Sequence, residues 1–189
     1  TATIFSSAQR MQRIVDDLLD LSRIESGGWI PSPRPIAAAT AAAEAVAPCR
    51  VEAQRKGVTL EVVVQPGAAT VYADPTALRQ LLANLADNAV RYTPAGGTIT
   101  VFAEPGDGGV WVGVRDSGIG IAAEHLPRIF ERFYRADPAR SREAGGTGLG
   151  LSIVKHLAEA HGGRVRAESA PGRGATIAAF FPFPAATTA

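Results

Sequence analysis

The chain has 189 residues, of which 46% are hydrophobic and 20% are charged, and its formal net charge is +1. This composition is typical of a globular domain with a sizeable core, and the small net charge argues against nucleic acid as a partner. The single cysteine, Cys49, excludes an intrachain disulfide framework and fits a reducing compartment. We find neither an apolar run of about 18 residues, the length that spans a membrane, nor the basic and apolar regions of a signal peptide.

Segment 4–26 is expected to form a long helix with a coiled-coil-like apolar seam and a polar opposite side. Such a seam needs a cover, which is either the chain's own domain or, as we prefer, a second helix in a hairpin or a dimer. The chain begins without methionine in the middle of this pattern, so we interpret it as a fragment of a longer protein. The apolar positions of the seam are Ile4, Met11, Ile14, Leu18 and Leu21, with Val15 and Leu19 beside them.

Residues 27–35 (GGWIPSPRP) are expected to form an extended linker, because three prolines in five positions forbid a helix. The main domain then covers 36–183, and 184–189 are expected to be a disordered tail. Asp74 as N-cap and Pro75 at the first position begin a helix that stops at Thr93-Pro94, and further helices are expected at 36–56 and 147–161. The expected strands are 58–65, 70–72, 98–103, 110–114, 164–168 and 175–181.

Hairpin turns at 106–109 and 171–174 indicate that neighbouring strands pair largely antiparallel. With three helices between the strands, the pattern predicts an α+β fold, an α/β two-layer sandwich with the helices on one face of the sheet. Segment 122–146 interrupts the alternation. It carries short helical pieces around IFERFY (129–134) and a polar, glycine-ended remainder that we expect to be mobile.

Two asparagines interrupt the apolar stripe of the helix that leads to Pro94. Asn84 and Asn88 are four residues apart, so their amides lie one turn above the other on the same face. Asparagine is a poor helix-interior residue, and two in register allow two explanations: solvated amides, or amide oxygens that face a ligand or a hard cation. Arg91 and Tyr92 follow one turn later and add a cation and an aromatic ring to the same end of the helix.

Two glycine-rich stretches are candidates for ligand contact. GTGLGL (146–151) opens a helix, where free N–H groups and the helix dipole favour phosphate, although a tight turn explains such glycines about as well. It is neither a P-loop nor a dinucleotide fingerprint, because no Lys-Ser/Thr follows the glycines and they lack the preceding strand, with an acidic residue about 20 residues on, that the fingerprint needs. In DSGIGI (116–121), the carboxylate of Asp116 either forms an Asx turn or accepts a hydrogen bond from the amine of a flat ligand such as adenine.

The order of these motifs resembles the ATP-binding catalytic domain of sensor histidine kinases of two-component systems. NLADNAVRYTP, DSGIGI, IFERFYR and GTGLGLSIVKHLAEAHGG correspond to the N, G1, F and G2 boxes of that family, in the family's order. The resemblance covers essentially the whole chain. It implies a Bergerat-type fold, a mixed and mostly antiparallel sheet covered on one face by three helices and preceded here by the long helix of 4–26.

The resemblance also implies roles at the site. Asn88 would bind Mg²⁺ through its amide oxygen, Asn84 would lie beside it near the phosphates, and Arg91, where the family usually has lysine, would contact phosphate. Asn84 and Arg91 are thus the expected catalytic residues. Asp116 would accept from the adenine amine, and 122–146 would form the ATP lid. The other expected contacts are Tyr92 on the adenine, Gly118, Gly120 and Ile121 along the pocket, Tyr134 and Arg135 beside the nucleotide, and Gly146, Thr147, Gly148, Leu149, Gly150 and Leu151 over the phosphates.

The implied reaction transfers the γ-phosphoryl group of MgATP to a histidine on the dimerisation hairpin, and from there to an aspartate in the receiver domain of a response regulator. Segment 4–26 resembles the second helix of that hairpin. The acceptor histidine stands on the first helix, in a His-Glu-x-x-Arg-x-Pro context that His125, His156 and His161 lack. We therefore expect a fragment of a cytoplasmic catalytic domain, homodimeric in the full-length protein, whose first hairpin helix and membrane-anchored sensor region lie upstream.

Three alternatives share parts of this pattern. ATP hydrolases of the same superfold, such as gyrase and Hsp90-type proteins, carry a glutamate one turn before the metal asparagine to activate water, where this chain has Asn84. Anti-sigma serine kinases lack the coiled-coil helix and the F box. A non-enzymatic nucleotide-binding or interaction module would not need the intact glycines and Asn88.

Overall fold

The computed structural model describes residues 8, 11–12, 14–19, 21–22, 28–136 and 146–184. The described residues between 8 and 22 are helical. The elements that follow them, in chain order, are β1 (Arg34–Ala37), α2 (Ala38–Arg55), β2 (Thr59–Val64), β3 (Thr70–Ala73), α3 (Pro75–Tyr92), β4 (Thr98–Gly106), β5 (Gly109–Asp116), the 3₁₀ turn η1 (Leu126–Arg128), α5 (Gly150–Ala160), β6 (Arg164–Ser169) and β7 (Ala175–Pro182).

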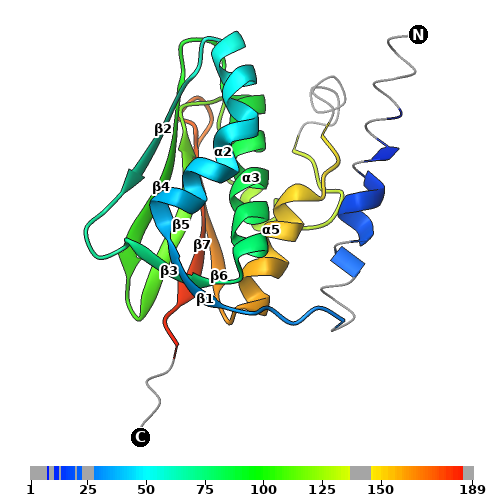
Figure 1. Cartoon of the computed structure of the whole chain (residues 1–189). Helices are drawn as coiled ribbons and strands as arrows, with labels where there is room; N and C mark the ends of the chain where they lie inside the picture. Colours follow the sequence, from blue (N-terminus) through cyan, green and yellow to red (C-terminus); the bar gives the residue numbers. More distant parts are fainter. Residues whose placement is uncertain are drawn as a thin grey trace, which may run out of the picture.

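Five strands form one sheet in the order β2-β4-β5-β7-β6, and β1 and β3 form a separate two-stranded sheet. Strands β4, β5, β7 and β6 pair antiparallel with one another, whereas β2 runs parallel to β4. Figure 1 shows α2, α3 and α5 next to one another on one face of the large sheet. The predicted α/β two-layer sandwich, with a mixed and mostly antiparallel sheet and three helices on one face, is therefore confirmed.

Strand β1 lies where the sequence predicts the end of a linker and the first turn of a helix. Pro35 pairs with Tyr72, and Ile36 pairs with Val71 in β3. Proline cannot donate a hydrogen bond to a ladder and is tolerated in a strand at a sheet edge, and β1 has only one neighbouring strand. The prolines thus indicate the extended path correctly, but they do not reveal that the path is paired.

Two predicted helical segments differ in the structure. Helix α5 begins at Gly150 rather than at Thr147. The helical piece expected around 129–134 is found instead at Leu126–Arg128, as η1. Phe133 has a φ of 60°, which a right-handed helix cannot contain. Its N–H donates to the Gly148 carbonyl at 2.8 Å. A hydrogen bond between segments distant in sequence therefore ends the helical turn, and no local pattern reports such a bond.

The main core lies between the helices and one face of the large sheet. The apolar stripe of α3 is buried through Leu78, Leu81 and Leu85, and α5 adds Ile153 and Leu157. Burying each such side chain contributes about 1.5–3 kcal/mol. Helix α2 buries mainly alanines, whose small side chains allow a short distance between helix axes. These contacts fix α3 and α5 against the sheet. They thereby also fix the positions of the polar residues on the two helices.

Arginine side chains, rather than the described helices, cover the aromatic residues on the other face of the large sheet. Phe102, Trp111 and Phe180 belong to a second, smaller apolar cluster. The guanidinium carbon of Arg164 lies 4.5 Å from the ring centroid of Phe180, and that of Arg166 lies 4.3 Å from the ring centroid of Trp111. Such cation–π contacts stabilise the pairs and shield the rings from water.

Residues ahead of β1 are held against the main domain by α3 and α5. Asp74 caps α3 with one carboxylate oxygen, and with the other it accepts a hydrogen bond from the N–H of Ser32 at 3.2 Å. His161, the C-cap of α5, accepts from the N–H of Asp74 at 3.0 Å. The His161 ring also contacts the rings of Trp29 and Phe181, with centroids 6.0 Å and 5.1 Å away. The histidine before the glycine pair is therefore a helix-end residue, as predicted.

The N-terminal helix leaves most of its described apolar seam uncovered. Leu21 is 1% exposed, whereas Met11, Val15, Leu18 and Leu19 are 40–67% exposed. Figure 1 places this helix beside α5, on the side away from the sheet. Contact with the main domain thus buries Leu21 alone among these five positions. Within the described ranges, no helix combines the length and the apolar character needed to cross a membrane.

Candidate functional site

A cavity of about 250 Å³ lies between α3, the loop after β5 and the start of α5. All four sequence motifs contribute to its lining, although they are far apart in the sequence. Of the residues predicted at the site, those that line the cavity are Asn84, Asn88, Arg91, Tyr92, Asp116, Gly120, Ile121, Tyr134, Arg135, Gly146, Thr147, Gly148, Gly150 and Leu151.

Gly118 and Leu149, also predicted at the site, do not line this cavity. Gly118 is buried behind it: its N–H donates to Asp116 Oδ1 at 2.7 Å, and a Cβ there would meet the carbonyl of Tyr92. Leu149 is fully buried in the main core. Both residues support the lining from behind. Spacing in a motif does not distinguish a lining residue from a residue behind it, so the sequence predicted both at the cavity.

The two asparagines face the cavity from consecutive turns of α3, where both are half-buried. The Nδ2 atom of Asn84 is buried and has no hydrogen-bond partner in the part of the chain that the structure describes. A Cβ on Gly150 would lie 3.6 Å from Oδ1 of the same amide. An unsatisfied buried amide costs about 1–3 kcal/mol, so a ligand acceptor that reaches Nδ2 of Asn84 would gain a hydrogen bond there.

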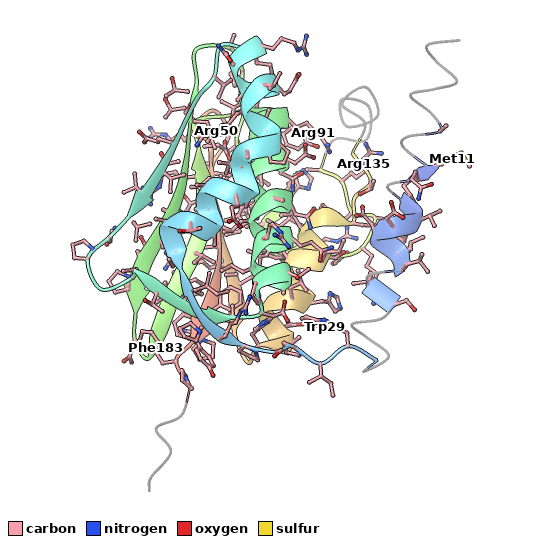
Figure 2. All side chains as sticks on the ribbon, viewed as in Figure 1. Met11, Trp29, Arg50, Arg91, Arg135 and Phe183 are labelled. Carbon is pink, nitrogen blue, oxygen red and sulfur yellow. The ribbon has the colours of Figure 1, made fainter. Side chains whose placement is uncertain are left out.

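Two arginines converge beside Gly146. Arg91 Nη2 forms an ion pair with Asp87 Oδ2 at 2.7 Å, and the arginine side chain is 14% exposed. A Cβ on Gly146 would lie 2.8 Å from Nη1 of Arg91 and 3.7 Å from Nη2 of Arg135, so the bare glycine leaves room for both groups. In the view of Figure 2, both side chains lie between α3 and the N-terminal helix. This end of the cavity suits an anionic ligand group.

The opposite end of the cavity carries the carboxylate of Asp116 among apolar neighbours. Its Oδ1 accepts hydrogen bonds from the N–H groups of Gly118 at 2.7 Å and Ala175 at 3.3 Å. Burial raises the pKa of this carboxyl, and the two hydrogen bonds offset the increase only in part. Val114 and Ile177 line the cavity beside it. Since the backbone occupies Oδ1, Oδ2 can accept from a ligand.

The glycine loop after Asp116 is supported by the turn between β6 and β7. The N–H of Gly172 donates to the carbonyl of Ile119 at 2.8 Å, and that of Gly174 donates to the carbonyl of Gly118 at 3.0 Å. A Cβ on Gly174 would collide with the backbone of Asp116. In the sequence, this glycine pair predicts only a hairpin turn, so its role as a support for the loop is visible only in the structure.

The aromatic motif forms one wall of the cavity. The hydroxyl of Tyr134 lies 2.7 Å from Nδ1 of His125. The guanidinium carbon of Arg128 lies 4.3 Å from the centroid of the Tyr134 ring. Phe133, one residue earlier, is joined to Gly148 by the hydrogen bond given above. These contacts hold the hydroxyl and one face of the tyrosine ring. The rest of the predicted lid, 137–145, lies outside the described residues, and so do Arg140 and Arg142.

An acidic residue from the N-terminal helix also reaches the cavity. Asp17 lines it and accepts a hydrogen bond from Oγ1 of Thr147 at 3.0 Å. The carboxylate thus lies near the start of α5, where the helix dipole is positive. Sequence reasoning assigned Asp17 to the solvated side of a coiled-coil-like helix, and no motif signals its position.

Apolar wall residues were missed as well, because in the sequence they are ordinary core positions of strands and helices. Asp87 was missed because it reads as an exposed helix residue. The additional lining residues are Leu85, Asp87, Ala89, Val114, Ile119, Ile129, Ala136, Ala175 and Ile177.

The cavity therefore has two chemically different ends. A hydrogen-bond acceptor between apolar walls suits a flat ring that carries an amine, and the arginines with the glycine-rich helix start suit an anionic tail. Among the described residues, no cluster of three or more His, Cys, Asp or Glu side chains could hold a metal ion. A cation at this site would depend on an asparagine oxygen together with oxygens of the ligand.

Comparisons with known proteins point in the same direction. A family profile described as "Histidine kinase-, DNA gyrase B-, and HSP90-like ATPase" matches residues 73–185. Sensor-like histidine kinase SenX3 of Mycobacterium tuberculosis is 37% identical over 179 residues, which cover 95% of this chain and 43% of SenX3. Sensor histidine kinase CusS of Escherichia coli K12 is 41% identical over 160 residues, which cover 85% of this chain and 33% of CusS. The chain spans less than half the length of these curated relatives.

Solved structures are similar over the same region. Full-length ShkA in complex with AMPPNP matches with a TM-score of 0.80 and 32% identity, over 95% of this chain and 38% of ShkA. The mycobacterial sensor histidine kinase MprB matches with a TM-score of 0.65 and 29% identity, over 80% of this chain and 97% of the MprB chain.

Proposed function

The chain belongs to the family of histidine kinase-, DNA gyrase B- and HSP90-like ATPases, as the ATP-binding catalytic domain of a sensor histidine kinase, and on this premise we propose that its cavity binds MgATP and directs the γ-phosphoryl group to a histidine of the dimerisation hairpin. The observation that carries the proposal is the polarity of the cavity. The lining carries the carboxylate of Asp116 and, around Gly146, the guanidinium groups of Arg91 and Arg135, which we assign to two different ends. An adenine amine and a triphosphate match these two ends.

At the adenine end, Oδ2 of Asp116 accepts from the exocyclic amine of the base. Tyr92 and Ile121 cover the faces of the ring, and the apolar walls exclude water from it. Because Oδ1 is already bound to two backbone N–H groups, the carboxylate cannot rotate freely. This fixed acceptor favours adenine over a base that presents a carbonyl at the same position.

At the phosphate end, the residues present fit a magnesium ion. Asn88 lines the cavity and has an amide oxygen that can bind the ion, and the buried Nδ2 of Asn84 one turn away, which has no partner among the described residues, can donate to a phosphate oxygen. Mg²⁺ keeps several waters and shares the oxygens of substrate phosphates, so a single amide oxygen from the protein is sufficient. When bound, the ion would neutralise charge on the phosphate oxygens.

In the reaction, a histidine nitrogen attacks the γ-phosphorus, the bond to the bridging β–γ oxygen breaks, and ADP leaves with the electron pair. The chain contributes positioning and positive charge, as is general for phosphoryl transfer. Arg91, oriented by Asp87, and Arg135 stabilise the charge that is transferred. Asn84 has no basic group that could take a proton from water, so the site favours transfer to a nucleophilic imidazole over hydrolysis.

The partners follow from the same assignment. The uncovered seam of the N-terminal helix, from Met11 to Leu19, is available to the other helix of a dimerisation hairpin and to a second subunit in a homodimer. The histidine on that hairpin receives the phosphoryl group and passes it to the receiver domain of a response regulator. The domain acts in the cytoplasm, where ATP is available, and the parent protein is anchored through an upstream sensor region.

The first test is calorimetry of MgATP binding to the wild type and to Asn88→Ala. We expect the wild type to bind MgATP, and Asn88→Ala to lose about tenfold in affinity with magnesium present. With EDTA in place of magnesium, the two proteins are expected to bind ATP equally, which separates loss of the ion from loss of the fold. A wild type that does not bind MgATP would overturn the proposal.

The second test identifies the acceptor. The chain is mixed with a separate hairpin fragment that carries the acceptor histidine, and radiolabelled MgATP is added. Acid-labile phosphate on the hairpin is the expected result, and a hairpin with His→Gln is the control. Label on serine, or release of free phosphate only, would instead support a serine kinase or a hydrolase of the same fold.

A further inference from the structure

Helix α3 ends with two carbonyl groups that the helix itself cannot pair. The carbonyl of Val90 would accept from the N–H four residues later, but that residue is Pro94, which has no N–H. The carbonyl of Arg91 also belongs to the unpaired last turn. Unpaired carbonyls at a partly buried helix end cost free energy. This end of the helix therefore needs a donor from elsewhere in the molecule.

Lys56, just after α2, supplies this donor. Its Nζ lies 2.6 Å from the carbonyl oxygen of Val90 and 3.2 Å from that of Arg91. The lysine side chain is half-buried, and an ammonium group at the C-terminus of a helix also interacts favourably with the helix dipole. One side chain from α2 thus completes the hydrogen bonding of the last turn of α3.

Backbone hydrogen bonds reinforce the same junction. The N–H of Gly96 donates to the carbonyl of Gly57, and the N–H of Thr59 donates to the carbonyl of Gly97, both at 2.9 Å. The turn after α2 is therefore joined to the loop after α3 by two backbone hydrogen bonds that follow the lysine contact in the sequence. Among the described residues, no such backbone donor reaches the carbonyl of Val90, where the lysine is the donor.

The same helix end supports two parts of the cavity. Arg91 and Tyr92 enter the cavity from it, and the carbonyl of Tyr92 accepts from the N–H of Ile119 in the glycine loop at 3.3 Å. Lys56 is not among the residues that line the cavity. Lys56 is therefore not in contact with a ligand in the cavity, and its hydrogen bonds connect it to the cavity through α3.

We propose that Lys56 is a positioning residue for nucleotide binding, which acts by holding the carbonyls of Val90 and Arg91. This inference rests on the proposed function, because it takes Arg91 and Tyr92 as nucleotide contacts. Without the ammonium group, the Val90 carbonyl has no donor, and the last turn of α3 must open towards water to find one. Arg91 and Tyr92 then leave the orientation in which they meet the phosphate and the base.

The test measures MgATP binding by calorimetry and the melting temperature for three variants. Lys56→Met keeps most of the apolar stem but removes every donor, and Lys56→Arg keeps the charge and the donors. Asp74→Ala is the matched control, because it removes the cap at the other end of the same helix and so weakens α3 far from the cavity. We expect about fivefold to tenfold weaker binding in Lys56→Met, recovery in Lys56→Arg, and less than about twofold change in Asp74→Ala.

Amide hydrogen exchange provides a second readout that does not depend on nucleotide. Exchange at Ile119 and Gly96, whose N–H groups bind to the junction, is expected to accelerate in Lys56→Met and not in Asp74→Ala. Unchanged exchange at both amides would overturn the inference.

The binding outcomes separate the two proposals. If Lys56→Met melts at a lower temperature but binds MgATP as the wild type does, Lys56 is only a helix cap, and the proposed function stands. If Asp74→Ala loses as much affinity as Lys56→Met, general loosening of α3 is the cause and the inference is wrong. A wild type that does not bind MgATP overturns the proposed function and this inference together.

Discussion

At the scale of single residues, the two oxygens of Asp116 have separate tasks. Oδ1 closes the glycine loop by accepting from Gly118 and Ala175, and Oδ2 is left for a ligand. Burial of a carboxylate among apolar groups is unfavourable by itself, and it raises the pKa of Asp116. The hydrogen bonds within the loop compensate for part of this cost, and in the proposed function the second oxygen binds the base.

Asp116→Asn tests this division. Asparagine has the same shape and keeps one oxygen for Gly118 and Ala175, but it presents an amide N–H₂ where Oδ2 stood. We expect MgATP binding to weaken about 10- to 100-fold, because a donor then faces the adenine amine. The melting temperature should fall by no more than about 4 °C. Asp107→Asn, in an exposed hairpin turn, is the control. Equal affinity for wild type and Asp116→Asn would show that the adenine end is assigned wrongly.

At the scale of elements, the turn between β6 and β7 and the loop after β5 behave as one unit. Gly172 and Gly174 both have a φ near 70°, at 73° and 71°, a conformation that strains any other residue. They differ in surroundings: a Cβ on Gly172 would meet nothing within 4 Å, whereas a Cβ on Gly174 would collide with the carbonyl of Asp116. The pair therefore separates backbone strain from contact between elements.

We expect Gly172→Ala to lower the free energy of unfolding by about 1 kcal/mol, the cost of the left-handed conformation alone. Gly174→Ala should cost more than about 3 kcal/mol, because two backbone segments must move apart. It should also weaken MgATP binding, since Asp116 moves with its loop. Urea unfolding and calorimetry measure the two effects. Equal destabilisation in both variants would mean that the turn does not support the loop.

At the scale of the whole molecule, His161 joins parts that are far apart in the sequence. Its Nε2 accepts from the N–H of Asp74, its Nδ1 lies 2.7 Å from the carbonyl of Leu157, and its ring contacts Trp29 and Phe181. This pattern requires a neutral imidazole that is protonated on Nδ1. Burial lowers the pKa of His161, and the hydrogen bond to Leu157 and the charge of Asp74 oppose the decrease.

The pH dependence of stability follows from this shift. In the unfolded chain a histidine has a pKa of about 6.5, above that of folded His161, so on acidification the unfolded state takes up the proton first. The contribution of His161 is therefore complete above about pH 6.5 and is lost as the pH falls below it. Between about pH 7.5 and pH 5.5, we expect the free energy of unfolding, measured with urea, to fall more in the wild type than in His161→Gln. Parallel pH profiles would contradict this prediction.

Features with a local cause could be predicted from the sequence. Asp74 and Pro75 begin α3 where the cap rule places them, and the glycine and asparagine motifs drew attention to the segments that meet at the cavity. Strand β1, the parallel pairing of β2 with β4 and the interruption at Phe133 could not be predicted. Each depends on a partner distant in the sequence, and spacing along the chain carries no information on such partners.

The same limit applies within the site. Gly118 and Leu149 belong to the motifs but lie behind the lining, because a motif specifies residue types and not the direction in which each one faces. Lys56 belongs to no motif, and its role depends on the absence of an N–H at Pro94 in another element. A sequence motif indicates which segments form the cavity. The residues that support these segments can be identified only in the folded structure.

The hydrogen bond from Thr147 to Asp17 has a thermodynamic consequence. A hydroxyl group has one proton, so Thr147 cannot donate to Asp17 and to a ligand oxygen at the same time. Donation of this proton to the N-terminal helix and to a ligand oxygen is therefore mutually exclusive. By linkage, the factor by which docking of the helix changes the affinity for such a ligand equals the factor by which the ligand changes docking of the helix. Docking of the helix therefore changes the affinity for such a ligand, and the ligand changes the docking equilibrium of the helix, both through the single proton of Thr147.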